Sequence, residues 1–254
     1  MAAYVPIDLR RHRSVVMHMA DDGEVLGWTR LANDPETLVA EVLKSGEAPE
    51  VAIEATYGWY WAVDALQAAG ANVHLVAPSK LSAFEGRRVK NDQRDCHVLG
   101  DLMRAKMLPE AWISTPQVRE WRELVRYWAK LVGMRSGLKA QAHAVLAKHG
   151  MGVPMSDLFG VGGRQMLAHL CESDTRFHSA YGQRIESLVV LVDALTGEID
   201  ELGDSIAHMF GHHAAYHAIQ QLPGIGPILA AVFVAEIVTY TASPRPLISL
   251  RGAG

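Results

Sequence analysis

The order of apolar runs in the first part of the chain restricts the fold more than any other feature. Three strand-like runs come first, at 4–8, 14–19 and 24–31, and Asp21-Asp22-Gly23 between the last two is a hairpin signal. Helix-like and strand-like runs then alternate, at 33–44, 49–54, 57–69 and 72–77. Three consecutive strands followed by alternating helices and strands predict an α/β domain in which helices cover the faces of a mixed sheet.

Two acidic residues stand at the ends of strand-like runs, and two more begin a later helix-like run. Asp8 ends the first strand-like run and Glu54 ends the fourth. Asp92 and Asp95 lie three apart at the start of an amphipathic run over 90–104, so in a helix both carboxylates share one face. Acids at the end of the first strand, at the end of the fourth and on a later helix match the ribonuclease H-like layout. We therefore predict this fold for the N-terminal domain.

Carboxylates in this arrangement indicate metal-dependent phosphodiester chemistry. Their oxygens are hard donors that suit Mg²⁺, and two ions about 4 Å apart can activate a nucleophile and stabilise a leaving oxygen. We predict that Asp8, Glu54, Asp92 and Asp95 are the catalytic metal ligands, with Mg²⁺ or Mn²⁺ as the cofactor.

Each acid also has a structural interpretation. An acidic pair such as Asp92 and Asp95 stabilises the first turn of a helix, and Asp8 suits a turn at a strand end. Glu54 suits a surface position, but its apolar neighbours at 51–53 weigh against that interpretation, because an unpaired carboxylate is costly in apolar surroundings.

The charge is distributed unevenly along the chain. The net charge is −4, yet residues 78–149 carry 14 basic and 7 acidic residues, which gives this segment +7. A basic segment between acidic flanks indicates contact with a polyanion, whereas a solvated basic helix face is the structural alternative. The basic residues nearest the proposed acidic site are candidates for binding nucleic-acid phosphates: Lys80, Arg87, Arg88 and Lys90.

Two long helix-like runs follow. One extends from 116 to about 149 with apolar residues at near-heptad spacing, and the other from about 176 to 212. They predict an antiparallel helical hairpin or an intermolecular coiled coil, through which the chain would form a homo-oligomer. The apolar positions equally suit an ordinary core. We interpret Trp121 and Trp128 as packing residues rather than as platforms for nucleic-acid bases.

Glycine-rich segments mark the remaining boundaries. The stretch 150–163 predicts a hinge, and Gly160-Val-Gly-Gly163 within it predicts a loop, because no strand precedes it as a nucleotide-binding fingerprint requires. We predict a ribonuclease H-like domain at 1–110, a helical coiled-coil region at 111–212 and a partial C-terminal domain at 213–254.

A second glycine motif lies near the C-terminus. Leu222-Pro-Gly-Ile-Gly226 separates two helix-like runs and resembles the hairpin of a helix-hairpin-helix element. Gly224 and Gly226 allow a tight turn whose amides can approach a phosphate just before a helix N-terminus. Such a contact would not depend on base sequence, and a purely structural turn is the alternative.

Composition excludes several classes of protein. Apolar residues make up 49% of the chain, enough to bury a sizeable core, but no apolar run reaches the roughly 18 residues that span a bilayer. The N-terminus lacks the basic and apolar segments of a signal peptide. Cys96 and Cys171 lie far apart, which argues against a disulfide framework or a cysteine zinc site. We therefore expect a cytoplasmic protein without a membrane partner.

Several segments together resemble the DEDD-type transposases of bacterial insertion sequences, a family related to the Piv invertase. They are Val5-Pro-Ile-Asp8, Ile53-Glu54-Ala-Thr-Tyr-Gly58, Val76-Ala-Pro-Ser-Lys80, Lys90-Asn-Asp-Gln-Arg-Asp95 and Leu222-Pro-Gly-Ile-Gly-Pro227. The resemblance covers nearly the whole chain. It implies a ribonuclease H-like domain, a coiled-coil insertion and a C-terminal transposase domain. It also implies that the four acids form the family's Mg²⁺-binding tetrad and that the chain assembles as a dimer or tetramer on DNA. Some relatives use a structured noncoding guide RNA, which makes such an RNA a candidate partner.

The C-terminal segment departs from the family pattern. In the family, the helix after Pro-Gly-Ile-Gly leads to a Ser-Gly segment that carries the nucleophilic serine, but Ser243 and Ser249 here stand in unlike contexts. We therefore expect a C-terminally truncated transposase that lacks this serine and is impaired in cleavage and recombination on its own. Two alternatives stay open: a metal-dependent junction-type nuclease using the same acids, and a catalytically silent remnant that binds nucleic acid or dimerises.

Overall fold

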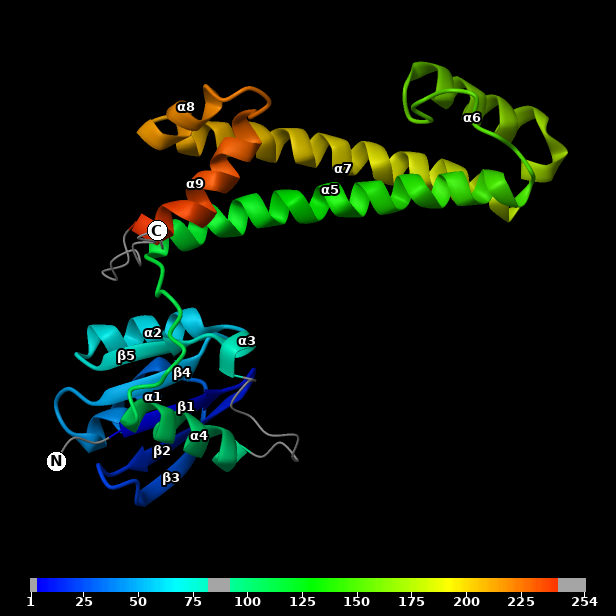
Figure 1. The fold of residues 1–254 in the computed structure, drawn as a ribbon. Coiled ribbons are helices and arrows are strands. Elements are labelled where there is room, and N and C mark those ends of the chain that lie inside the picture. The colour runs from blue at the N-terminus through cyan, green and yellow to red at the C-terminus, as the bar shows by residue number, and fades with distance from the viewer. Residues whose placement is uncertain (1–3, 82–91, 242–254) are drawn as a thin grey trace, which may run out of the picture. The chain divides into compact units, whose positions relative to one another are not determined.

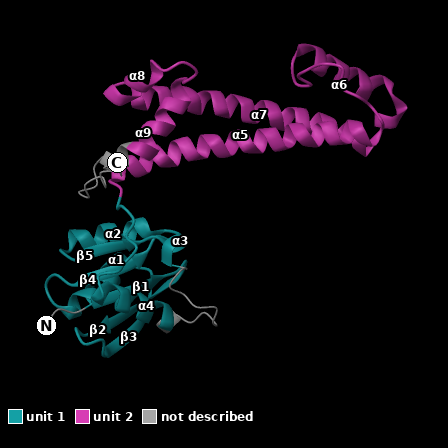
Figure 2. Cartoon of the chain, in the orientation of Figure 1, with its two compact units in different colours: residues 1–113 teal, residues 114–254 magenta. Residues whose placement is uncertain are grey.

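The chain forms two compact units, residues 1–113 and 114–254 (Figure 2). The structure, a computed structural model, describes residues 4–81 and 92–241, without the side chains of 92, 93 and 238–241. Several residues singled out from the sequence lie outside this description: Arg87, Arg88, Lys90, Ser243 and Ser249.

The first unit is built on a mixed sheet of five strands (Figure 1). Its order is β3-β2-β1-β4-β5, with β2 antiparallel to its neighbours β1 and β3, and with β4 and β5 parallel to β1. The strands are β1 (Tyr4–Leu9), β2 (Arg13–Met19), β3 (Val25–Ala32), β4 (Glu50–Glu54) and β5 (Asn72–Val76). The mixed sheet predicted from the order of apolar runs is confirmed.

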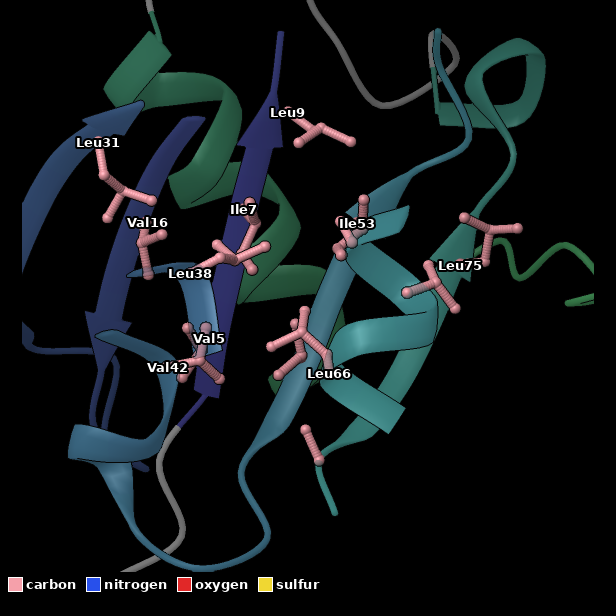
Figure 3. Packing of buried hydrophobic residues seen from close by; sticks show 14 residues of the cluster. Val5, Ile7, Leu9, Val16, Leu31, Leu38, Val42, Ile53, Leu66 and Leu75 are labelled. Atoms are coloured by element: carbon pink, nitrogen blue, oxygen red, sulfur yellow. The ribbon is translucent and has the colours of Figure 1, made fainter. Parts of the chain in front are cut away.

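Helices cover both faces of this sheet. They are α1 (Pro35–Val42), which continues into the short 3-10 helix η1 (Leu43–Ser45), α2 (Trp59–Ala68), α3 (Pro78–Leu81) and α4 (Asp92–Arg104). Side chains alternate along a strand, so Val5 and Ile7 of β1 pack with Leu38 of α1 and Leu66 of α2 on one face (Figure 3). Cys96 of α4 packs on the other face, against the second set of β2 side chains.

Local signals define α1. The Asp34 side chain accepts a hydrogen bond from the Thr37 amide at 2.8 Å, and Pro35 occupies the first turn. A side-chain acceptor at the N-cap satisfies an amide that the helix cannot, and proline suits the first helical position. The helix-like run predicted over 33–44 is therefore confirmed.

The second unit is entirely helical among its described residues. Its elements are α5 (Pro116–Lys148), α6 (Val161–Ser173), the 3-10 helix η2 (Thr175–Phe177), α7 (Ala180–Phe210), α8 (Ala214–Gln220) and α9 (Pro227–Thr241). The long helices α5 and α7 lie side by side (Figure 1). Trp128 Nε1–H donates a hydrogen bond to the Ile199 carbonyl at 3.0 Å, and Trp121 packs on Phe210. Both tryptophans are thus packing residues, as predicted, whereas a coiled coil between chains stays a prediction.

The segment between the long helices differs from the prediction. The expected loop at Gly160-Val-Gly-Gly163 is wrong, because Gly160 is the N-cap of α6 and the next three residues form its first turn. The Arg164 amide donates to the Gly160 carbonyl at 2.9 Å, which is the bond pattern of a helix. Leu167 and Leu170 of α6 are buried in the unit's core, and this packing stabilises a helix whose glycines disfavour it.

His74 fastens the last segment of the first unit to the sheet edge formed by β5. The Ala111 amide donates to the Leu75 carbonyl at 2.7 Å, so this segment runs along β5. The His74 ring lies between Glu50 Oε2, 2.7 Å from Nε2, and Glu110 Oε1, 2.8 Å from Nδ1. Partial burial lowers the pKa of His74, but the hydrogen bonds to the two carboxylates outweigh it, and the net shift is upward.

The raised pKa of His74 predicts a loss of stability as the pH rises. A group whose pKa is higher in the folded state stabilises the fold fully at a pH below its unfolded-state pKa, which is about 6.5 for histidine. This stabilisation disappears as the pH rises past the folded-state pKa. We expect the melting temperature of His74→Gln to lie below that of the wild type at pH 6 and to approach it by pH 9. The exposed His12 provides the control variant His12→Gln, and a pH-independent difference for His74→Gln would contradict the prediction.

Candidate functional site

Asp8 and Glu54 come together because their strands are neighbours in the sheet. β1 and β4 are parallel, with Ile7 opposite Ile53, so the next residue of each strand reaches the same edge. Ile7 and Ile53 face the core with α1 and α2, and alternation therefore turns Asp8 and Glu54 to the face that α4 covers. Both acids line one cavity of about 490 Å³. The sequence placed each acid at a strand end, and the sheet makes them neighbours.

An arginine joins Asp8 to the acid on α4. Arg10 Nε–H donates to Asp8 Oδ2 at 2.9 Å, and Arg10 Nη2 lies 3.9 Å from Asp95 Oδ2. The Asp95 oxygen is buried. Three of the four predicted acids therefore belong to one region. Glu54 lines the same cavity as Asp8, and Asp95 shares the Arg10 cation with Asp8.

The structure describes the side chains of only three of the four predicted acids. The Asp92 side chain lies outside the described residues, and among the described side chains no three histidine, cysteine, aspartate or glutamate groups are placed to hold a metal ion. The carboxylate oxygens of Asp8, Glu54 and Asp95 nevertheless have the chemistry that Mg²⁺ or Mn²⁺ prefers. Joint ligation by the four acids stays a prediction.

The cavity is also lined by residues to which the sequence assigned no role in binding or chemistry. Besides Asp8 and Glu54 it is lined by Leu9, Arg10, Arg11, Thr56 and Tyr57. Tyr57 is 80% exposed beside the acids, so its ring is accessible from solvent. In the sequence, only their positions indicated that these residues lie near the acids. Both arginines directly follow the end of the first strand, and the tyrosine comes shortly after the end of the fourth.

The other predicted contacts with nucleic acid fall into separate places. Lys80 is exposed on α3 in the first unit. Gly224 lies between α8 and α9 in the second unit with a φ of +83°, a left-handed conformation that favours glycine, and α9 begins directly after Gly226. The tight turn is therefore observed, while its contact with phosphate stays a prediction.

A model of the DEDD transposase family of the IS110 type, described as "Transposase", matches residues 5–151, which is more than half of the chain. The chain belongs to this transposase family. The match includes all four predicted acids and the beginning of the helical unit.

Two further comparisons give relatives of the chain. The Sinorhizobium fredii protein y4qE, whose name describes it as a transposase, is 27% identical over 257 residues, which cover 98% of this chain and 62% of that protein. The chain thus spans less than two thirds of this relative. The Thermus thermophilus RuvC structure superposes on 43% of this chain and 99% of its own, with 15% identity and a TM-score of 0.33. No helix among the described residues is both long and apolar enough to cross a membrane.

Proposed function

We propose that this member of the transposase family binds DNA and cleaves its strands at the cavity beside Asp8 and Glu54, in a ribonuclease H-like domain. The observation that carries the proposal is the convergence of these acids at one edge of the sheet, with Asp95 joined to them through Arg10. The family match to residues 5–151 supplies DNA as the class of substrate.

The residues present suit a divalent cation. Asp8, Glu54 and Asp95 would hold it, together with Asp92. When bound, Mg²⁺ or Mn²⁺ supplies positive charge that stabilises the leaving oxygen of a phosphodiester and favours deprotonation of the attacking group.

The chain's own residues would bind and orient the DNA. Arg11 lines the cavity, and its guanidinium can pair with a phosphate through two parallel hydrogen bonds. The exposed ring of Tyr57 at the same cavity can stack on an unpaired base, which suits a DNA strand that is opened or branched. Lys80 and the Gly224 turn would add contacts that are independent of base sequence.

A second candidate function is binding without cleavage. The arrangement of Arg10 between Asp8 and Asp95, and the lack of a three-ligand group among the described side chains, favour it. A guide RNA and a homo-oligomer through the helical unit remain predictions from the family resemblance.

Nicking of DNA distinguishes these functions. The purified chain is incubated with supercoiled plasmid and with a labelled four-way junction, in Mg²⁺, Mn²⁺, Ca²⁺ or EDTA. We expect binding in all four conditions, weakening steeply as salt rises, and nicking only in Mg²⁺ or Mn²⁺. Binding with no nicking in any metal would favour the second candidate, and cleavage confined to the junction would indicate a junction-type nuclease. Lack of binding at low salt would overturn the proposal.

A further inference from the structure

The Arg10 guanidinium occupies the place between two proposed metal ligands. It donates through Nε to Asp8 at 2.9 Å and approaches Asp95 with Nη2 at 3.9 Å. The side chains of Asp8 and Asp95 are 15% and 20% exposed, so water screens them only in part. Without a cation nearby, two such carboxylates would repel each other, and Arg10 offsets that repulsion.

The backbone at Arg10 is held from both sides, whereas its side chain is partly exposed. The Arg10 amide donates to the Arg13 carbonyl at 3.1 Å, and the Arg10 carbonyl accepts a hydrogen bond from Asn33 Nδ2. Asn33 is in turn fixed by Ser14 Oγ–H, which donates to Asn33 Oδ1 at 2.7 Å. The Arg10 side chain itself is 39% exposed and lies at the open cavity. Its guanidinium can therefore leave the acids by side-chain rotation, without rearrangement of the turn between β1 and β2.

We propose that Arg10 is a displaceable counter-ion, which holds the acids together before a divalent cation binds and which that cation must displace. The inference rests on the proposed metal role of Asp8. The Asp8 oxygen that accepts from Arg10 cannot offer the same lone pair to a metal ion, so the two cations compete. Arg10 is thus a positioning residue that sets the metal affinity of the site.

The test compares Mn²⁺ binding, measured by titration calorimetry, in the full chain and three variants. Arg10→Gln removes the competing cation, and we expect its Mn²⁺ dissociation constant to fall about tenfold. Arg13→Gln removes an equal charge at the start of β2, at an exposed position outside the cavity lining. We expect its Mn²⁺ dissociation constant to change by less than about twofold. Asp8→Asn is expected to lose the binding event.

A second readout is the melting temperature without metal. We expect Arg10→Gln to melt below Arg13→Gln in EDTA and to gain more from added Mn²⁺, because its acids lack their counter-ion until the metal binds. If Arg10→Gln fails to fold, Arg10→Lys takes its place. It keeps the charge but lacks the forked donors, so its Mn²⁺ affinity should exceed that of the wild type by a smaller factor.

The possible failures are distinguishable. Equal or weaker Mn²⁺ affinity in the Arg10 variant, with binding lost in Asp8→Asn, would overturn the counter-ion role and leave the proposed metal site intact. A gain in affinity that persists when Asp8→Asn is added to the Arg10 variant would place the ion elsewhere and overturn the inference. Lack of Mn²⁺ binding in both the wild type and the Arg10 variant would overturn the inference together with the metal-dependent function.

Discussion

Replacing Glu54 with glutamine is expected to lower the Mn²⁺-dependent nicking rate by about 100-fold or more. The amide keeps the size of the side chain but removes the negative charge and one hard oxygen from the cavity that Glu54 shares with Asp8. Changes to groups that merely support metal ligands commonly cost 10–100-fold, so loss of a ligand should cost at least as much. Asp8→Asn should behave in the same way.

The chain offers a matched control for Glu54→Gln. Glu36 is an exposed glutamate on α1, and Glu36→Gln removes the same charge from the same unit away from the cavity. The initial nicking rate, the Mn²⁺ affinity and the melting temperature are measured for each variant. Equal nicking by Glu54→Gln and Glu36→Gln, with both proteins folded, would show that Glu54 takes no part in the chemistry.

Replacing Gly182 with alanine is expected to destabilise the helical unit by about 2–3 kcal/mol. Gly182 lies in the first turn of α7, where an added methyl carbon would overlap the Phe177 carbonyl oxygen. The obstacle is a backbone atom, and the Phe177 side chain is buried and packs against His149 in a tilted arrangement, with ring centroids 4.9 Å apart. The η2 turn therefore cannot move away without disturbing the core.

Gly197 is the internal control for this effect. It lies in the same helix α7, is exposed, and has no atom within 4 Å of the position that a methyl carbon would take. Gly197→Ala should stabilise the protein by about 0.5–1 kcal/mol, because alanine loses less backbone entropy in a helix. Urea unfolding followed by helix content measures both variants, and the prediction fails if the two alanine substitutions shift the midpoint in the same direction.

Local sequence rules predicted the helices and strands whose apolar spacing and capping residues lie within a short segment. Alternating apolar runs located the strands, and the helix-like run over 33–44 located α1, which Asp34 caps. The same rules placed the start of α5 at Pro116, which Thr115 caps, and its end within one residue of Lys148. These features depend on neighbours in the sequence, so they can be predicted without knowledge of the fold.

The rules failed where contacts between distant residues outweighed local preference. Glycines at the start of α6 favour a loop, yet burial of Leu167 and Leu170 makes that segment helical. The second long helix begins at Ala180, four residues after the predicted start. The Asp174 side chain accepts a hydrogen bond from the Arg176 amide at 3.0 Å and stabilises a separate turn there.

By itself, the sequence determined the order of strands and helices, the family and the identity of the candidate acids, because periodicity, capping and motif spacing are properties of short segments. Only the tertiary structure decided that Asp8 and Glu54 share one cavity and that Arg10 lies between Asp8 and Asp95. The reason is that pairing of β1 with β4 and packing of α4 on the sheet bring together residues separated by more than forty positions. No rule confined to neighbouring residues specifies which of them will meet.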